Sequence, residues 1–157
     1  MQGGASIYNI TLDIPWQNLT DIWDLVNRPA IGFHASRSNE YRDWTLDVNT
    51  DSIETFSVGA EIGGLTSSDH IIIGFDDRTQ AIFFNVLTGN TNAFGPNAQV
   101  SWWDGSSYIA SGTTYDGTAD ITGVTPLGRT GALKWTPPAL ENEFPQYLFG
   151  KNGWFYK

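Results

Sequence analysis

The stretch AQVSWWDGSSYIA, residues 98–110, decides how this chain folds. Two strand-like runs flank Asp104-Gly105, and an Asp-Gly pair in that position is the strongest short-range signal of a β-hairpin. Neighbouring residues of a strand point to opposite faces of the sheet. We therefore expect Trp102 to belong to the core and Trp103 to lie on the other face of the hairpin.

Trp103 and Tyr108 flank the turn, so they are placed to form a cross-strand aromatic pair. An exposed aromatic pair on a β-sandwich is a surface on which the apolar face of a sugar can stack. The alternatives are a pair that only stabilises the hairpin, or rings that a neighbouring segment or subunit covers. Trp103 and Tyr108 are therefore our candidate ligand-binding residues.

Outward from the hairpin, the chain reads as short strands separated by turn signals. Three consecutive isoleucines at 71–73 predict that residues 70–75 form a strand buried on both faces. Residues 41–48 alternate between polar and apolar side chains and predict another strand, whereas residues 111–118 read as a loop. Further strands are expected at 7–14, 30–35, 53–62, 80–87, 131–136 and 153–157, with one helix at 20–28. This pattern predicts an all-β fold, an antiparallel β-sandwich of jelly-roll-like form with at most one short helix.

Length and composition agree with this fold class. The chain has 157 residues, which predicts a single β-sandwich domain over residues 1–157. It has no cysteine, which excludes disulfides, thiolate nucleophiles and cysteine zinc sites. The sequence stops inside the last expected strand. We therefore expect either a fragment of a longer polypeptide or a strand that pairs with a neighbouring chain.

The net charge of the chain limits the classes of partner that it is expected to bind. Asp and Glu number 17 against 8 Lys and Arg, which gives a formal net charge of −9. Binding to phosphate backbones needs cations that replace counterions, so we expect neither nucleic acid nor an anionic membrane as a partner. No apolar run approaches the roughly 20 residues of a membrane-spanning helix, and the first residues do not resemble a signal peptide.

Residues that could carry catalysis are few. Ser67-Ser68-Asp69-His70 places triad-type residues side by side in sequence, whereas a triad needs them to converge in space. Paired carboxylates occur at Asp76-Asp77 and at Glu141 and Glu143, but Asp favours turns through its own hydrogen bonding. We therefore expect a protein that is not an enzyme.

One loop has the ligand chemistry of a calcium site. Residues 116–120, DGTAD, supply two carboxylates and several carbonyl groups, and calcium prefers such oxygen ligands. The spacing does not match an EF-hand. Asp116 and Asp120 are the candidate calcium ligands, and no other cofactor is expected.

A series of motifs in residues 65–156 resembles a β-sandwich domain that recurs in large structural proteins of tailed phages and related virus-like sequences. The motifs are LTSSDH (65–70), IIIGF (71–75), IFF (82–84), VSWWDGSSY (100–108), DGT (116–118), TGALKWTPP (130–138) and FGKNGWFY (149–156). The upstream LTDIWD (19–24) is similar to a lead-in seen with such domains. The resemblance covers about three-fifths of the chain. The family more often has Trp at the position of Tyr108 and Ser at that of Thr130.

The resemblance implies a building block of a virion or tail, with no catalytic residues to carry over. It implies contacts with copies of itself or with other virion subunits, and hence an oligomer. The protein would be made in the host cytoplasm and would reside in the extracellular particle. The alternative is a carbohydrate-binding or adhesin module that uses exposed aromatic side chains.

Overall fold

The structure is a computed structural model that describes residues 29–38, 40–49, 59–62, 65–66, 68–86, 98–119 and 126–157. The strand expected at 7–14 and the helix expected at 20–28 lie outside these residues. The described part is built from antiparallel strands with one short α-helix, so the predicted all-β class is confirmed.

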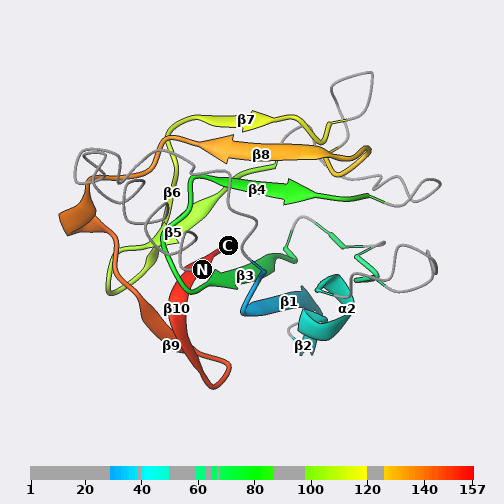
Figure 1. Cartoon of the computed structure of the whole chain (residues 1–157), viewed down its shortest axis with the longest axis horizontal. Coiled ribbons are helices and arrows are strands. Elements are labelled where there is room, and N and C mark those ends of the chain that lie inside the picture. The colour runs from blue at the N-terminus through cyan, green and yellow to red at the C-terminus, as the bar shows by residue number, and fades with distance from the viewer. Residues whose placement is uncertain are drawn as a thin grey trace, which may run out of the picture.

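Within these residues, ten strands form three sheets (Figure 1). They are β1 (Gly32–Arg37), β2 (Glu40–Asp43), β3 (Ile71–Phe75), β4 (Ala81–Phe84), β5 (Ser101–Trp103), β6 (Tyr108–Ala110), β7 (Thr114–Asp116), β8 (Gly131–Trp135), β9 (Gln146–Leu148) and β10 (Lys151–Tyr156). The five-stranded sheet has the order β2-β1-β3-β10-β9, the three-stranded sheet has the order β4-β8-β7, and β5 and β6 form the hairpin. Ser101 and Lys157 exchange two backbone hydrogen bonds of 2.8 and 2.9 Å, which attach the hairpin to the end of β10.

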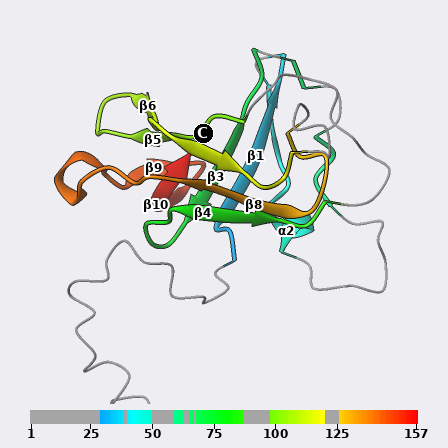
Figure 2. The ribbon, with the colours of Figure 1, turned by 90° about the horizontal axis from the view of Figure 1, so that it is seen from above.

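The core lies between the two larger sheets, whose strands cross at a large angle in the view of Figure 2. Tyr156 of β10 joins the sheets, because its ring centroid lies 5.0 Å from that of Trp135 in β8. The buried apolar cluster takes side chains from both sheets and from the start of the hairpin: Phe33, Ala35, Trp44, Ile73, Phe75, Ile82, Val100, Leu133, Trp135 and Tyr156. This arrangement is a sandwich packed face to face.

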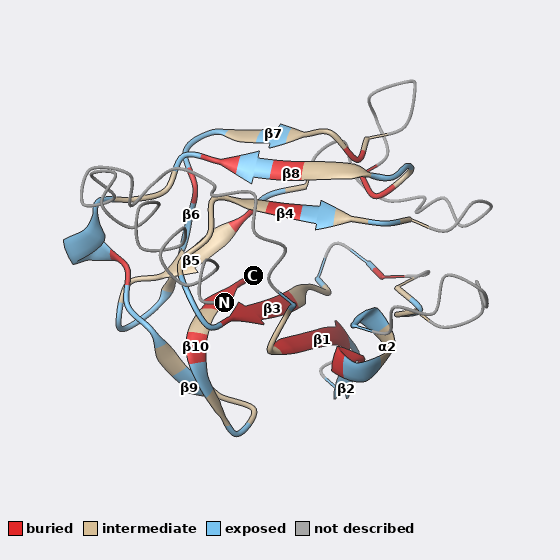
Figure 3. Cartoon of the chain, viewed as in Figure 1, coloured by how far each residue is buried: buried red, intermediate tan, exposed pale blue. Residues whose placement is uncertain are grey.

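Strand β3 lies between β1 and β10 and is buried on both faces, as the isoleucine run predicted (Figure 3). Its Ile73 and Phe75 face the core, while Gly74 faces the other way. A methyl group at Gly74 would lie 2.4 Å from Cε1 of Phe155, one of the most buried side chains. The glycine is therefore needed because the Phe155 ring packs directly on the backbone of β3.

The predicted strand at 41–48 is wrong in its second half. Strand β2 ends at Asp43, and helix α2 (Thr45–Val48) follows. The Asp43 carboxylate accepts hydrogen bonds from the backbone N–H of Thr45 at 2.9 Å and from its hydroxyl at 2.5 Å. This local capping turns the chain out of the sheet, because Asp competes with the strand for backbone donors.

Two further expectations need correction. The loop expected at 111–118 contains strand β7, which pairs with β8 at the edge of the three-stranded sheet. Of the strand expected at 53–62, residues 59–62 are described and form no strand. The segment at 140–148 begins with the 3-10 turn Leu140–Asn142 and then forms β9.

A buried ion pair joins the two connections that cross between the sheets. Nε and one terminal nitrogen of Arg78 lie 2.7 Å from the same carboxylate oxygen of Glu143, and that terminal nitrogen also donates to the Pro138 carbonyl at 2.8 Å. The side chains of Arg78 and Glu143 are only 9% and 3% exposed. Arg78 follows β3 and Glu143 precedes β9, so the pair holds both crossings together.

We expect Glu143→Ala to lower the free energy of unfolding by about 3–5 kcal/mol, because it leaves the buried Arg78 guanidinium without its carboxylate. Urea-induced unfolding followed by tryptophan fluorescence measures this loss. The control is Glu141→Ala, an exposed carboxylate two residues away, which should change stability by no more than about 0.5 kcal/mol. Equal stability of the two variants would contradict the role assigned to the pair.

Candidate functional site

The predicted aromatic pair is present on the hairpin. Trp103 of β5 lies opposite Tyr108 of β6, and their ring centroids are 5.3 Å apart at an interplanar angle of 64°. Both side chains are half-buried, while Trp102 on the opposite face packs against the core. Because the rings are steeply tilted, a sugar ring could stack on one of them but not on both at once.

Asp104 and Gly105 build the turn that positions this pair. Oδ1 of Asp104 accepts hydrogen bonds of 2.7 Å from the backbone N–H groups of Ser107 and Ser106, and these bonds lower the pKa of the carboxyl group. Gly105 has a φ of 96°, a conformation that favours glycine. The turn thus fixes the spacing between Trp103 and Tyr108.

Residues far along the chain complete the surroundings of the pair. The Gln146 amide of β9 donates to the Tyr108 hydroxyl at 2.7 Å, and the Lys157 ammonium lies 6.0 Å from the Tyr108 ring centroid. Burial raises the pKa of Tyr108 to about 12, so the hydroxyl stays protonated at neutral pH. Phe144 donates its backbone N–H to the Trp103 carbonyl at 3.0 Å. No local pattern in the sequence links these neighbours to the pair, since they lie tens of positions further along the chain.

The loop predicted to bind calcium is only half described, because Asp120 lies outside the described residues. Oδ1 of Asp116 accepts from the backbone and hydroxyl of Thr118 at 2.8 and 2.5 Å. The carbonyl of Thr118 accepts from the backbone of Gly128 and Arg129 at 2.9 and 3.0 Å. Oδ2 of Asp116 is buried and has no hydrogen-bond partner within the described residues. Calcium binding at this loop stays a prediction.

Four of the described aspartates, Asp43, Asp69, Asp104 and Asp116, accept hydrogen bonds from Ser or Thr in local turns. Asp43, Asp104 and Asp116 each bind the residue two positions later, as above. Asp69 accepts from the backbone N–H and hydroxyl of Thr66 at 2.7 and 2.8 Å, and these bonds lower its pKa. The Asp69 carboxylate is thus directed at Thr66, whereas His70 Nε2 lies 2.6 Å from the Tyr41 hydroxyl. Ser67 lies outside the described residues.

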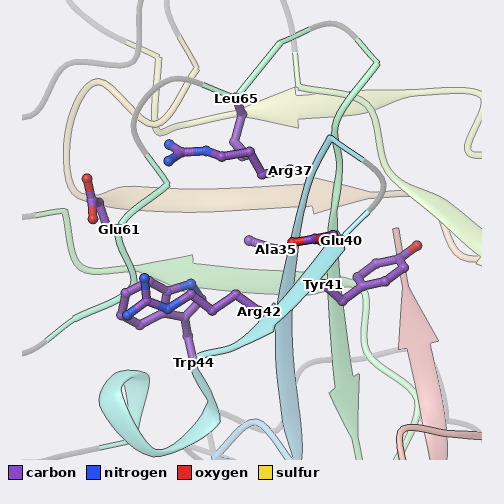
Figure 4. Close-up of a pocket in the computed structure, with 8 residues that line it drawn as sticks. All are labelled: Ala35, Arg37, Glu40, Tyr41, Arg42, Trp44, Glu61 and Leu65. Carbon is purple, nitrogen blue, oxygen red and sulfur yellow. The ribbon is translucent and has the colours of Figure 1, made fainter.

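A pocket of about 210 Å³ opens beside β2 (Figure 4). Its walls combine apolar and charged side chains: Ala35, Arg37, Glu40, Tyr41, Arg42, Trp44, Glu61 and Leu65. The guanidinium carbon of Arg42 lies 3.8 Å from the centroid of the Trp44 ring, a cation–π contact. No motif in the sequence indicated this pocket, because Glu61 and Leu65 join the β1–β2 segment from a later part of the chain.

A cluster of rings covers the face of the five-stranded sheet that looks away from the core. Phe149, in the turn between β9 and β10, stacks on the buried His34 with centroids 3.6 Å apart, and its ring meets Tyr41 edge-on at 5.2 Å. Burial lowers the pKa of His34, although Asp43, 3.6 Å away, opposes this shift. Burial also lowers the pKa of His70. Both imidazoles are therefore neutral at pH 7.

No family model matches the sequence, and searches of curated proteins and of solved structures find no match either. The likeness to phage structural domains thus stays a prediction. Within the described residues, no helix has the length and apolar character to cross a membrane.

We expect the free energy of unfolding to fall as the pH drops from about 7 to 5. In the unfolded chain histidine titrates near 6.5, whereas burial holds the pKa of His34 lower in the folded chain. The unfolded state therefore binds more protons below pH 6.5, and stability is lost on acidification. His34→Gln should flatten this dependence, as measured by urea unfolding at a series of pH values. An unchanged slope in this variant, with Arg129→Gln as control, would contradict the prediction.

Proposed function

We propose that this chain is a non-enzymatic structural protein of a phage or virus particle that acts through protein–protein contacts. The observation that carries the proposal is the apolar outer face of the three-stranded sheet. There Phe83 of β4 and Tyr115 of β7 are 63% and 65% exposed. Large exposed apolar side chains on one sheet face are typical of surfaces that another protein covers.

The register of the sheet describes this face. Phe83 lies opposite Ala132, and Tyr115 lies opposite Lys134 of the central strand β8. Two rings on the outer strands therefore stand on either side of a strand with a small side chain and a single positive charge. A neighbouring subunit would bury both rings, and one of its acidic side chains could pair with Lys134. Copies of this chain have such side chains, because its net charge is −9.

Two further properties support assembly. In the described part of the chain, β4 and β7 are edge strands, and edge strands offer unpaired backbone groups to other chains. The negative charge keeps the free module soluble before it assembles. Together with the resemblance of residues 65–156 to virion building blocks, these properties make the particle its proposed location.

We expect the double variant Phe83→Ser/Tyr115→Ser to lose self-association beyond small oligomers, because it removes the apolar surface that a neighbour covers. Light scattering and negative-stain electron microscopy of the purified full chain over a range of concentrations would measure this. The matched control is Tyr147→Ser, which removes a similarly exposed ring from β9. Equal association of wild type, double variant and control would count against the outer face as the contact surface.

The second candidate function is glycan binding at the hairpin. It is favoured by the polar groups next to Trp103 and Tyr108, namely the Gln146 amide and the Lys157 ammonium. On a glycan array, binding that disappears in Trp103→Ala and persists in Phe83→Ser/Tyr115→Ser would support this function. An array without any bound glycan would leave assembly as the function to pursue.

A further inference from the structure

Strand β2 forms one edge of the five-stranded sheet, and all four of its residues are exposed. In the described part of the chain no other strand pairs with its outer side. An edge of this kind is a template for a strand from another molecule. Which strand fits it depends on the backbone groups and on the charges that β2 presents.

The hydrogen bonds of β1 show which backbone groups of β2 point outward. Ser36 donates its N–H to His70 beside β3 at 2.8 Å, whereas Phe33 accepts from Trp44 at 2.8 Å. Backbone groups along a strand alternate in direction, so Ala35 and Arg37 also face β2. Their partners in the register are Arg42 and Glu40. Tyr41 and Asp43 therefore direct their N–H and C=O groups away from β1, to the open edge.

The side chains of β2 alternate as well. Glu40, Tyr41 and Arg42 all border the pocket beside β2. The Tyr41 ring, however, points away from Arg42 (Figure 4) and contacts His70 and Phe149 on the other face of the sheet. The order along the pocket side of the edge is thus one negative charge followed, two residues later, by one positive charge.

Consider a second copy of β2 that pairs antiparallel with the first about a two-fold axis. The outward backbone groups match when the axis passes through Glu40, Tyr41 or Arg42. With the axis at Glu40 or at Arg42, two like charges lie directly opposite each other, which is destabilising. With the axis at Tyr41, each Glu40 lies opposite the Arg42 of the other copy, and the two Tyr41 residues exchange backbone hydrogen bonds.

We propose that β2 pairs with β2 of a second copy in this Tyr41-centred register and joins two five-stranded sheets into one. The charges on β2 then have two effects. They oppose pairing in the other registers and with other strands, and they favour the Tyr41-centred pairing of two copies. The proposal deepens the proposed function, on which it rests, by naming one partner and one surface. It uses an edge that is distinct from the outer face of the three-stranded sheet.

The paired surface is small, since each copy contributes one four-residue strand. Standard protein interfaces bury about 1,200–2,000 Å². The dimer is therefore weak on its own and forms at high protein concentration or within an assembly, where other contacts hold the copies close together.

Charge reversal tests the register. Glu40→Arg places two arginines opposite each other in both cross-strand pairs, and Arg42→Glu places two glutamates there, so each variant alone should weaken the dimer by about tenfold. A one-to-one mixture of the two variants should dimerise again, because each pair then joins an arginine of one copy to a glutamate of the other. Analytical ultracentrifugation of the full chain measures the dissociation constants, and Glu141→Arg is the control for a charge reversal outside β2.

Hydrogen exchange provides a test that needs no variant. The amide protons of Tyr41 and Asp43 should exchange more slowly at concentrations where the wild-type chain is dimeric than where it is monomeric. Unchanged exchange at these amides, or a dimer that Glu40→Arg and Arg42→Glu leave intact, would overturn the β2 interface. A chain that is monomeric at every concentration would overturn it as well. If the Phe83/Tyr115 face still drives association when the β2 variants have no effect, the proposed function survives without this dimer.

Discussion

The buried ion pair between Arg78 and Glu143 is the constraint on which the rest of the molecule depends. The chain crosses from the five-stranded to the three-stranded sheet after β3 and returns before β9, and the pair fastens these two crossings to each other. Tyr156 extends the network, because its hydroxyl accepts the Thr79 backbone N–H at 2.9 Å, and burial raises its pKa. A buried pair of this kind is strong only when each group keeps its partners.

Local patterns in the sequence account for the parts of the fold that depend on neighbouring residues. The Asp104-Gly105 turn predicted the hairpin and the pairing of Trp103 with Tyr108, because a turn fixes the register of the strands that flank it. The isoleucine run predicted the central strand β3, since a strand covered on both faces accommodates apolar side chains in succession.

The sequence could not predict features that depend on distant partners. Strand β7 is short and polar, and it is a strand only because β8 offers it hydrogen bonds. The alternation at 41–48 looked like one long strand, but the contact of Asp43 with Thr45 ends it early. Gln146, Glu143 and the pocket beside β2 belong to sites whose other members lie tens of residues away, so no spacing rule reveals them.

The distribution of charge bears on the proposed assembly role. Four carboxylates stabilise turns that contain Ser or Thr, namely those of Asp43, Asp69, Asp104 and Asp116. Glu143 is buried and pairs with Arg78. Glu40 and Arg42 lie exposed on the edge strand β2, where Arg42 also stacks on Trp44. Charges on edge strands usually prevent pairing, but a negative and a positive charge two residues apart are self-complementary about the residue between them. The same side chains that reject a foreign strand therefore accept a second copy of their own.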